Sequence, residues 1–486
     1  ALRTPRGQWV RVVGGWSPYQ FVEGRAPTPA ELTEVAPDVP VFVLQLYSRG
    51  YVNRAGVQAM GLSARTGSPP GTRVEITEDG GAILHAEPSP GLLYGMVASL
   101  PGLSAREQEV SSLHFYRELN RFGITSVVDP GGGGHAYPAD YAASEGLAAR
   151  GDLSVRVGNY LFAAEAGRER AQYEGWTARE VMGVNRAVHL LQGYTLEGAG
   201  ENLVASAADY ENFLAPRPEL AGSMEVDLRA VVEHLVRVRW PIRIHATYDE
   251  SITRMLDVFE AVDRDLAREA GAPPRPGAGL DGLRIAIDHA ETMSAESLAR
   301  LRSLGGGVAV QSRMAYAGED FVARYGAGAG SSAPPLRMLV ESGVPLGAGS
   351  DATRVGSHNP WETLEWLVTG RTVGGLELYG PENRLSRAEA LLVHTVGSAW
   401  FTGDERVKGR LAVGQYADFA VLSDDYFEVQ ASEIGEIESV LTVVGGRCVW
   451  AAEEFAARVD VPPLPPLPPI EPAWSPVRVF GGYQRE

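Results

Sequence analysis

Short apolar runs alternate with longer amphipathic stretches from residue 123 onward. Helical periodicity is clear between the later runs, as at Leu228–Val238 and Ile252–Ala267. Short buried strands that alternate with amphipathic helices predict a parallel sheet covered by helices. The strands are expected at Ile124–Asp129, Leu153–Leu161, Glu201–Ala205, Pro241–His245, Leu283–His289, Gly307–Gln311 and Val344–Gly349. A closed βα barrel needs eight strands, so the pattern predicts a barrel whose first strand is missing from this series.

The two flanks have a different texture. Before the barrel, short strands are expected at Trp9–Trp16 and Val39–Leu46, then a Gly-, Pro- and Ser-rich insertion at 58–106 and a helix at Ser104–Phe122. After a last barrel helix at Arg387–Trp400, a turn and strand at Gly409–Leu422 and a hairpin at Ser439–Trp450 predict a small β unit. We therefore divide the chain into an insertion and barrel-associated segment (1–122), a barrel domain (123–403), a small β domain (404–456) and a Pro-rich tail (457–486).

Composition narrows the function. The chain of 486 residues has 61 acidic and 43 basic side chains, a net charge of −18, which argues against a nucleic-acid or anionic-membrane partner. No apolar run is long enough to span a bilayer, and the one cysteine, Cys448, forms no intrachain disulfide. We expect a cytoplasmic protein that acts on a small-molecule substrate.

Lys408 is the single lysine in the sequence. It lies in a polar stretch that we expect at the surface, so a P-loop or a Schiff-base lysine is excluded. For the same reason no carboxylated lysine can bridge two metal ions.

Three predicted strands end in residues that could bind a metal. His245, His289 and Asp351 each stand at a strand end, and barrel enzymes carry their chemistry there. Two imidazoles and a carboxylate suit zinc or another divalent ion. The alternative is that each residue caps its strand through a hydrogen bond. Glu201, after a Gly-rich approach, is a fourth candidate ligand, with a solvated turn glutamate as the alternative.

The motifs around these residues resemble the amidohydrolase superfamily. His245–Thr247, Asp288–Glu291 and Gly349–Arg354 occur in the family's order, most closely that of the amidohydrolase-3 branch with its N-substituted formamide deformylases. The resemblance implies an α/β fold, a distorted (β/α)8 TIM barrel with a small β-sandwich-like domain formed by the chain ends. It also implies one or two divalent ions, zinc foremost, held by His245, His289 and Asp351, with Asp351 as general base. Glu201 falls where many members have a carboxylated lysine.

One departure from the family concerns the first strand. Family members carry a His-x-His pair at its end, whereas the nine histidines of this chain are all isolated. We expect this strand and its pair upstream of Ala1. The rival explanation is a natural variant with one metal or none.

Weaker signals indicate substrate and subunit contacts. Candidate substrate-binding residues follow the predicted strands, and they are His135 beside Gly131–Gly134, Arg313, Tyr316, Arg354 and His358. The run Val461–Pro469 is typical of a polyproline II segment that packs along the surface or bridges to a second subunit, and we expect a homodimer.

The sequence therefore predicts a metal-dependent hydrolase that cleaves a C–N bond in an amide, cyclic amide or formamide. Asp351 would act as base on a metal-activated water. Two alternatives stay open. One is a catalytically inactive barrel that binds a small molecule or partner. The other is a metal-dependent decarboxylase or deaminase on the same scaffold.

Overall fold

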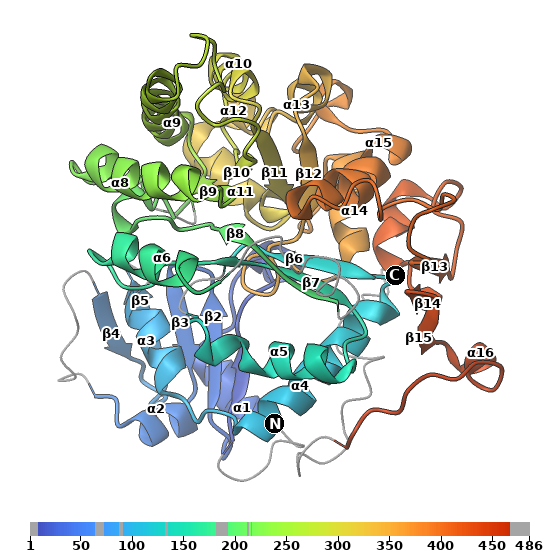
Figure 1. The fold of residues 1–486 in the computed structure, drawn as a ribbon. Helices are drawn as coiled ribbons and strands as arrows, with labels where there is room; N and C mark the ends of the chain where they lie inside the picture. The colour runs from blue at the N-terminus through green and yellow to red at the C-terminus, as the bar shows by residue number, and fades with distance from the viewer. Residues whose placement is uncertain are drawn as a thin grey trace.

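A curled sheet of seven parallel strands forms the centre of the molecule (Figure 1). The structure is a computed structural model that describes residues 8–63, 72–86, 91–131, 135–180, 193–210, 213–214 and 216–466. The sheet has the order β12-β11-β10-β9-β8-β7-β6, and within the described residues β6 and β12 are its two edges. The strands are β6 (Ser126–Asp129), β7 (Arg156–Leu161), β8 (Tyr194–Ala199), β9 (Ile242–Ala246), β10 (Ile285–His289), β11 (Gly307–Gln311) and β12 (Leu346–Gly349). The expected distorted α/β barrel is confirmed.

Amphipathic helices cover the outside of this sheet. In α9 the residues Ile252, Met255, Phe259 and Val262 recur at helical spacing and are almost fully buried, so this face packs on the barrel core. The helices of the barrel region are α4 (Ala105–Arg121), α5 (Ala142–Arg150), α6 (Glu169–Thr177), α8 (Met224–Arg237), α9 (Asp249–Glu269), α10 (Ala295–Ser303), α11 (Arg313–Tyr325), α12 (Ala327–Gly330), α13 (Leu336–Ser342), α14 (Pro360–Thr369) and α15 (Arg387–Leu392). The expected last helix continues past α15 as a π-helical segment, Val393–Gly397, and a 3-10 turn, Trp400–Thr402.

The strand expected at Glu201–Ala205 is wrong. The strand is β8, Tyr194–Ala199, and a 3-10 turn occupies Ala205–Ala207. The glycines at the end of β8 are typical of a loop, but Gly198 is required there by close packing. A Cβ at Gly198 would lie 2.2 Å from the carbonyl oxygen of Pro241 on the neighbouring strand. Glu201 consequently follows the carboxyl end of β8, which is where a barrel presents its chemistry.

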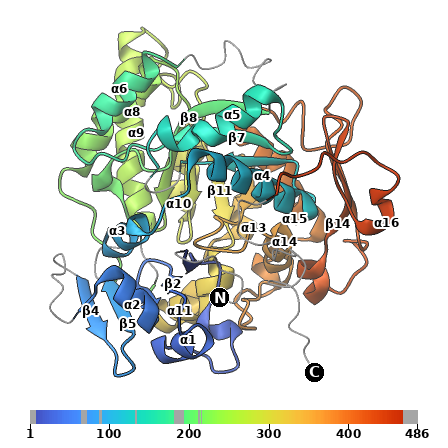
Figure 2. The ribbon, with the colours of Figure 1, turned by 90° about the horizontal axis from the view of Figure 1, so that it is seen from below.

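A separate five-stranded sheet is formed by residues 10–86, with its own small core around Phe42, Val52 and Leu84. In both views it lies on one side of the barrel, opposite the three-stranded sheet (Figures 1 and 2). Its order is β1-β2-β3-β5-β4, so the insertion contributes the β4–β5 pair. The elements are β1 (Val10–Val12), α1 (Pro29–Val35), β2 (Val41–Gln45), β3 (Arg49–Val52), α2 (Arg54–Met60), β4 (Thr72–Ile76), β5 (Ala82–Ala86) and α3 (Gly91–Ser99).

The C-terminal sheet packs against α4. It consists of β13 (Phe419–Leu422), β14 (Ser439–Val444) and β15 (Arg447–Ala451), followed by α16 (Glu453–Ala456). The predicted hairpin is confirmed, with Gly445 and Gly446 at its turn. Thr442 Oγ1 donates to the Asn120 carbonyl at 2.6 Å, which fixes this sheet to the end of α4.

Lys408 is buried, contrary to the surface position that its polar neighbours indicate. Its Nζ lies 2.9 Å from Asp404 Oδ2, and both side chains are nearly inaccessible. The carboxylate offsets the burial of the ammonium group. The lysine is thus engaged in an ion pair remote from the strand ends that carry Glu201 and the histidines.

The beginning of the Pro-rich run packs along α4. Arg117 Nη2 donates to Pro462 O at 2.7 Å, and His114 Nε2 lies 3.0 Å from Pro465 O. Residues 467–469 of this run lie outside the described residues. Among the described helices, none is both long and apolar enough to cross a membrane.

Candidate metal centre

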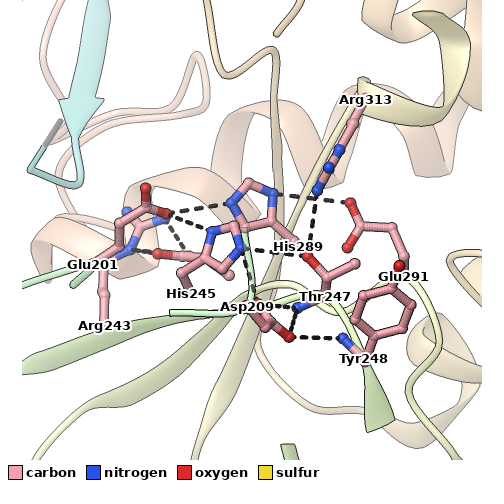
Figure 3. Close-up of polar contacts among 10 residues, drawn as sticks. Glu201, Asp209, Arg243, His245, Thr247, Tyr248, His289, Glu291 and Arg313 are labelled. Carbon is pink, nitrogen blue, oxygen red and sulfur yellow. Dashed lines mark hydrogen bonds and ion pairs between the residues drawn. The ribbon is translucent and has the colours of Figure 1, made fainter. Parts of the chain in front are cut away.

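Three side chains from adjacent barrel strands converge at one point (Figure 3). Glu201 follows β8, His245 lies near the end of β9, and His289 is the last residue of β10. One ligand atom from each lies within 4.8 Å of the other two. β9 and β10 are adjacent, and their register pairs Asp288 with His245. The two histidines therefore lie side by side, with ring centroids 4.2 Å apart.

Both imidazoles face the same oxygen of Glu201. His289 Nε2 lies 3.3 Å from Glu201 Oε2, and His245 Nδ1 lies 3.6 Å from it. Two atoms that bind a tetrahedral zinc at about 2.0–2.1 Å are about 3.3 Å apart, so these separations fit shared coordination. The buried His245 Nδ1 also has no hydrogen-bond partner among the described residues. These donors fit a divalent cation.

Asp209 sets the orientation of His245. The His245 Nε2–H group donates to Asp209 Oδ1 at 3.1 Å, which leaves the Nδ1 lone pair for Glu201's side of the ring. The fully buried Asp209 is itself fixed, since it accepts from the backbone N–H groups of Thr247 and Tyr248. No spacing motif marks this aspartate, so the sequence analysis missed it.

Glu291 stands behind the other histidine. Its Oε1 lies 3.9 Å from His289 Nδ1, and its buried Oε2 has no hydrogen-bond partner in the part of the chain that the structure describes. His289 has a backbone φ of 78°, which is unusual for a residue other than glycine. Such strained positions concentrate at functional sites. Glu291 is two residues beyond His289 in the sequence, and that proximity is the signal that could have identified it.

Charge in the cluster is strongly coupled. Burial opposes ionisation of Glu201, but the two imidazoles outweigh it and hold the pKa of Glu201 below its ordinary value. Burial would also lower the pKa of His245, but Asp209 and Glu201 raise it to about 10. Without a cation, the cluster is therefore stabilised by ion pairs between protonated imidazoles and ionised carboxylates.

Asp351 lies near this cluster but is not one of the three grouped ligand residues. It follows β12 and has a φ of 54°. Burial raises the pKa of Asp351 to about 6, the charge of Glu201 acts in the same direction, and His289 opposes both. Its roles as ligand and base stay predictions.

A buried ion pair fills the barrel interior next to the cluster. Arg243 Nη2 lies 2.6 Å from Asp288 Oδ1, and both side chains are almost inaccessible. Each is one or two residues from a histidine of the cluster, so the pair fixes β9 and β10 relative to each other. The sequence pattern did not identify it, because alternate inward positions of a barrel strand are usually apolar.

Two of the predicted substrate residues have internal partners. Arg313 Nη1 donates to Thr247 Oγ1 at 3.3 Å, and this hydroxyl lies 3.3 Å from His245 Nε2. Arg313 is thus connected to the cluster through one side chain. Tyr316 donates its hydroxyl proton to Glu362 and accepts from the Ser357 backbone N–H, so it supports the loop after β12.

The other three predicted substrate residues are spread around the barrel. Arg354 lies in the loop after β12, and its carbonyl accepts from the Gly15 N–H. The His358 ring packs edge-on against Phe115 and Phe122 on and beside α4, and its Nε2 lies 3.6 Å from Glu118. His135 is exposed beside Tyr141, and Gly132–Gly134 of its loop lie outside the described residues. Substrate contact stays a prediction for all three.

The five-stranded sheet reaches the metal centre. Tyr47, in the turn between β2 and β3, packs on Tyr210 with ring centroids 6.1 Å apart, and the Tyr210 ring is 4.2 Å from that of His245. On another side, a Cβ at Gly14 would lie only 2.0 Å from the Arg354 carbonyl oxygen, so only glycine permits this approach. The part of the chain before the insertion, residues 8–57, therefore contacts the segments that follow β8 and β12.

A comparison with protein-family models gives a match over residues 1–450 to the model described as the amidohydrolase family. The chain belongs to the amidohydrolase family. This confirms the family indicated by the sequence motifs.

Similar proteins span most of this amidohydrolase. YtcJ of Bacillus subtilis, which bears an amidohydrolase name, is 25% identical over 92% of this chain and 80% of its own length. An N-substituted formamide deformylase of Arthrobacter pascens is 24% identical over 91% of this chain and 79% of its own. A metal-dependent hydrolase of Pyrococcus horikoshii has the same fold, with a TM-score of 0.58 and 19% identity over 89% of this chain and 80% of that one.

Family membership and the geometry of the centre agree. The family match and the grouping of Glu201, His245 and His289 at the barrel mouth both support a metal-dependent hydrolase that uses a divalent ion. Glu201 is the candidate ligand that the sequence placed least securely, because the strand expected to begin at Glu201 in fact ends before it.

Proposed function

We propose that this protein hydrolyses a C–N bond in an amide, cyclic amide or formamide at a divalent metal, with zinc as the preferred ion. One observation carries the proposal, namely that His245 Nδ1 and His289 Nε2 face the same oxygen of Glu201. Two nitrogens and a carboxylate oxygen form a donor set that zinc accepts.

The role of each residue follows from its position. A divalent ion in this centre supplies Lewis acidity, which lowers the pKa of a bound water and polarises a carbonyl group. His245 and His289 would hold the ion as neutral imidazoles, and Glu201 would supply the carboxylate, for one ion or for two. Asp351 accepts a proton from the attacking water and delivers it to the leaving nitrogen as the C–N bond breaks.

The kind of bond is supported by a relative rather than by the ligands. The formamide deformylase of Arthrobacter pascens acts, by its name, on N-substituted formamides, and it aligns with this chain almost from end to end. Ligand sets of this kind also serve deaminases, so the bond must be tested with substrates.

Side chains around the centre form the substrate pocket in this proposal. Arg313 and Arg354 supply positive charge for a carbonyl or carboxylate, while Tyr316, His358 and His135 contact more distant parts of the substrate. Tyr47 and Tyr210 form an aromatic wall beside His245, which suits a planar or apolar substituent on the amide.

The test combines metal analysis with product analysis. The purified chain should bind at least one zinc or other divalent ion per molecule. The ion-loaded protein should release formate and an amine from N-substituted formamides, or open cyclic amides to a single amino acid product. Chelation should remove the activity, and zinc should restore it. A protein that takes up no divalent ion would instead be a binding barrel, release of ammonia from an amino group would indicate a deaminase, and release of carbon dioxide a decarboxylase.

A further inference from the structure

A cavity lies where α4, the end of α5, the β14–β15 hairpin and the Pro-rich segment meet. Its volume is about 410 Å³, within the usual range for small-molecule sites. Its charged lining consists of Arg106, Arg117, Arg150, Arg447 and Asp152. None of the residues of the metal centre lines it.

Two of these arginines are neutralised by carboxylates. Arg106 Nη1 and Arg150 Nη2 lie 3.2 and 3.0 Å from Glu109 Oε2. Arg150 also lies 3.0 Å from Asp152. The hydrogen bond that Arg150 donates to Asp152, together with the charge of Glu109, accordingly raises the pKa of Arg150.

The other two arginines contact backbone carbonyl groups. Arg117 Nη2 donates to Pro462 O at 2.7 Å. Arg447 donates to Gly151 O at 3.2 Å and to Leu153 O at 2.7 Å. Within the described residues neither arginine has a carboxylate partner, so two full positive charges remain at the cavity of a chain whose net charge is −18.

Arg117 is the more constrained of the two. Its Nε is buried and has no hydrogen-bond partner among the described residues. Burial lowers the pKa of Arg117, and the adjacent Arg447 charge acts in the same direction. A guanidinium without a carboxylate partner and with a spare donor, at the wall of a cavity, favours an anion that can accept from its fork.

The Pro-rich segment forms one wall of the cavity. His114 and Arg117 are one helical turn apart on α4, and they bind Pro465 and Pro462, which are one polyproline II turn apart. This regular match holds the segment against the helix. Leu113, Val449 and Leu464 add an apolar wall.

We propose that this cavity binds a small organic anion, whose carboxylate or phosphate group is held by Arg117 and Arg447 and whose apolar part contacts Leu113 and Val449. The charged group of the ligand accepts hydrogen bonds from the forked guanidinium groups. The apolar part of the ligand fits the apolar residues in the same lining. The site is separate from the metal centre, so its ligand is not the substrate of the proposed hydrolysis.

The test is direct binding of two probes to the full chain. Benzoate and phenyl phosphate share the apolar ring and differ in the anionic group, so calorimetry with each probe identifies the preferred head group. Arg117→Gln keeps a polar side chain but removes the charge and the fork of the guanidinium. It should weaken binding of the preferred probe roughly tenfold or more, and Arg117→Lys should give a smaller loss.

Arg170→Gln is the matched control. Arg170 is an exposed arginine paired with Glu174 on α6, so this change removes one positive charge elsewhere. It should leave binding of both probes unchanged. Equal affinity of Arg117→Gln and wild type, or no binding of either probe to the wild type at millimolar concentration, would overturn the proposal. Circular dichroism of each variant verifies the fold, and Arg447→Gln supplies a second route to the same loss.

Discussion

His245 is held between two carboxylates, with Nε2 3.1 Å from Asp209 and Nδ1 3.6 Å from Glu201. The shorter contact fixes the proton on Nε2, so that Nδ1 presents its lone pair to a cation. Asp209 thereby orients the ring of His245, a candidate metal ligand, although Asp209 itself is not one of the three grouped ligands. The two carboxylates have separate roles on one ring.

Asp209→Asn should lower zinc affinity roughly 10–100-fold, because an amide no longer stabilises the required tautomer. Competition with a chelator of known affinity measures the loss. Asp263→Asn is a matched control, since Asp263 is also buried and accepts backbone N–H groups, from Gly277 and Gly279, but lies outside the centre. If both variants lose zinc equally, Asp209 has no specific role.

Glu201→Gln should reduce the metal bound per chain, because glutamine keeps the shape of the side chain and supplies no charge. If Glu201 bridges two ions, one should be lost, and if it binds one, that ion should bind more weakly. Elemental analysis distinguishes these results. Glu169→Gln is the control, since Glu169 is a buried glutamate that accepts from the Ala205 N–H. An unchanged metal content in Glu201→Gln would remove Glu201 from the centre.

Asp351→Asn should reduce kcat about 10²–10⁴-fold while the fold is retained, because the change removes the base and keeps its volume. Steady-state kinetics on the substrate found in the product screen measure the loss. Metal content should be determined on the same sample, so that loss of a ligand is separated from loss of a base. A rate near that of the wild type would contradict the assignment.

Tyr47→Ala should raise KM about 3–10-fold for substrates with a planar substituent, since an aromatic contact contributes about 0.5–1.5 kcal/mol. Small aliphatic amides should be affected little. Tyr19→Ala is the control from the same segment, because Tyr19 binds Asp320 on α11 rather than Tyr210. Equal effects on both substrate types would show that Tyr47 does not contact the substrate.

His394 should make the fold sensitive to mild acid. Burial lowers the pKa of His394 to about 4 from an ordinary value of 6.5. The unfolded chain therefore takes up a proton first, and stability is complete above pH 6.5 and falls as the pH decreases toward 4. The loss at pH 5 is at most about 2 kcal/mol. Urea unfolding of wild type and His394→Gln at pH 7.5 and pH 5 should show a difference that changes with pH, whereas a constant difference would refute this effect.

The sequence predicted the elements whose periodicity is simple. β9 and β10 were found because short runs rich in isoleucine lead up to His245 and His289. The hairpin around Gly445 and Gly446 was found because its turn residues are diagnostic. β8 was misplaced because close packing on Pro241 requires glycine in a strand, and glycine usually marks a loop.

The site was predictable where ligands end strands, and less so elsewhere. Asp209 lies in an irregular segment and meets His245 only through the tertiary fold, so local patterns give no sign of it. Arg243 and Asp288 are charges at inward positions, where only their mutual pairing makes burial tolerable. Lys408 was misjudged for the same reason, since Asp404 was needed to explain it.

The contact between Gly14 and the Arg354 carbonyl bears on how this scaffold can be re-engineered. Because the backbones meet without room for a methyl group, the first segment of the chain and the loop after Asp351 are shaped to each other. A chimaera that transplants the five-stranded sheet from a relative must therefore bring the 350–356 loop with it. The candidate ligands after β8 and on β9 and β10 can stay unchanged, so the two parts can be exchanged separately.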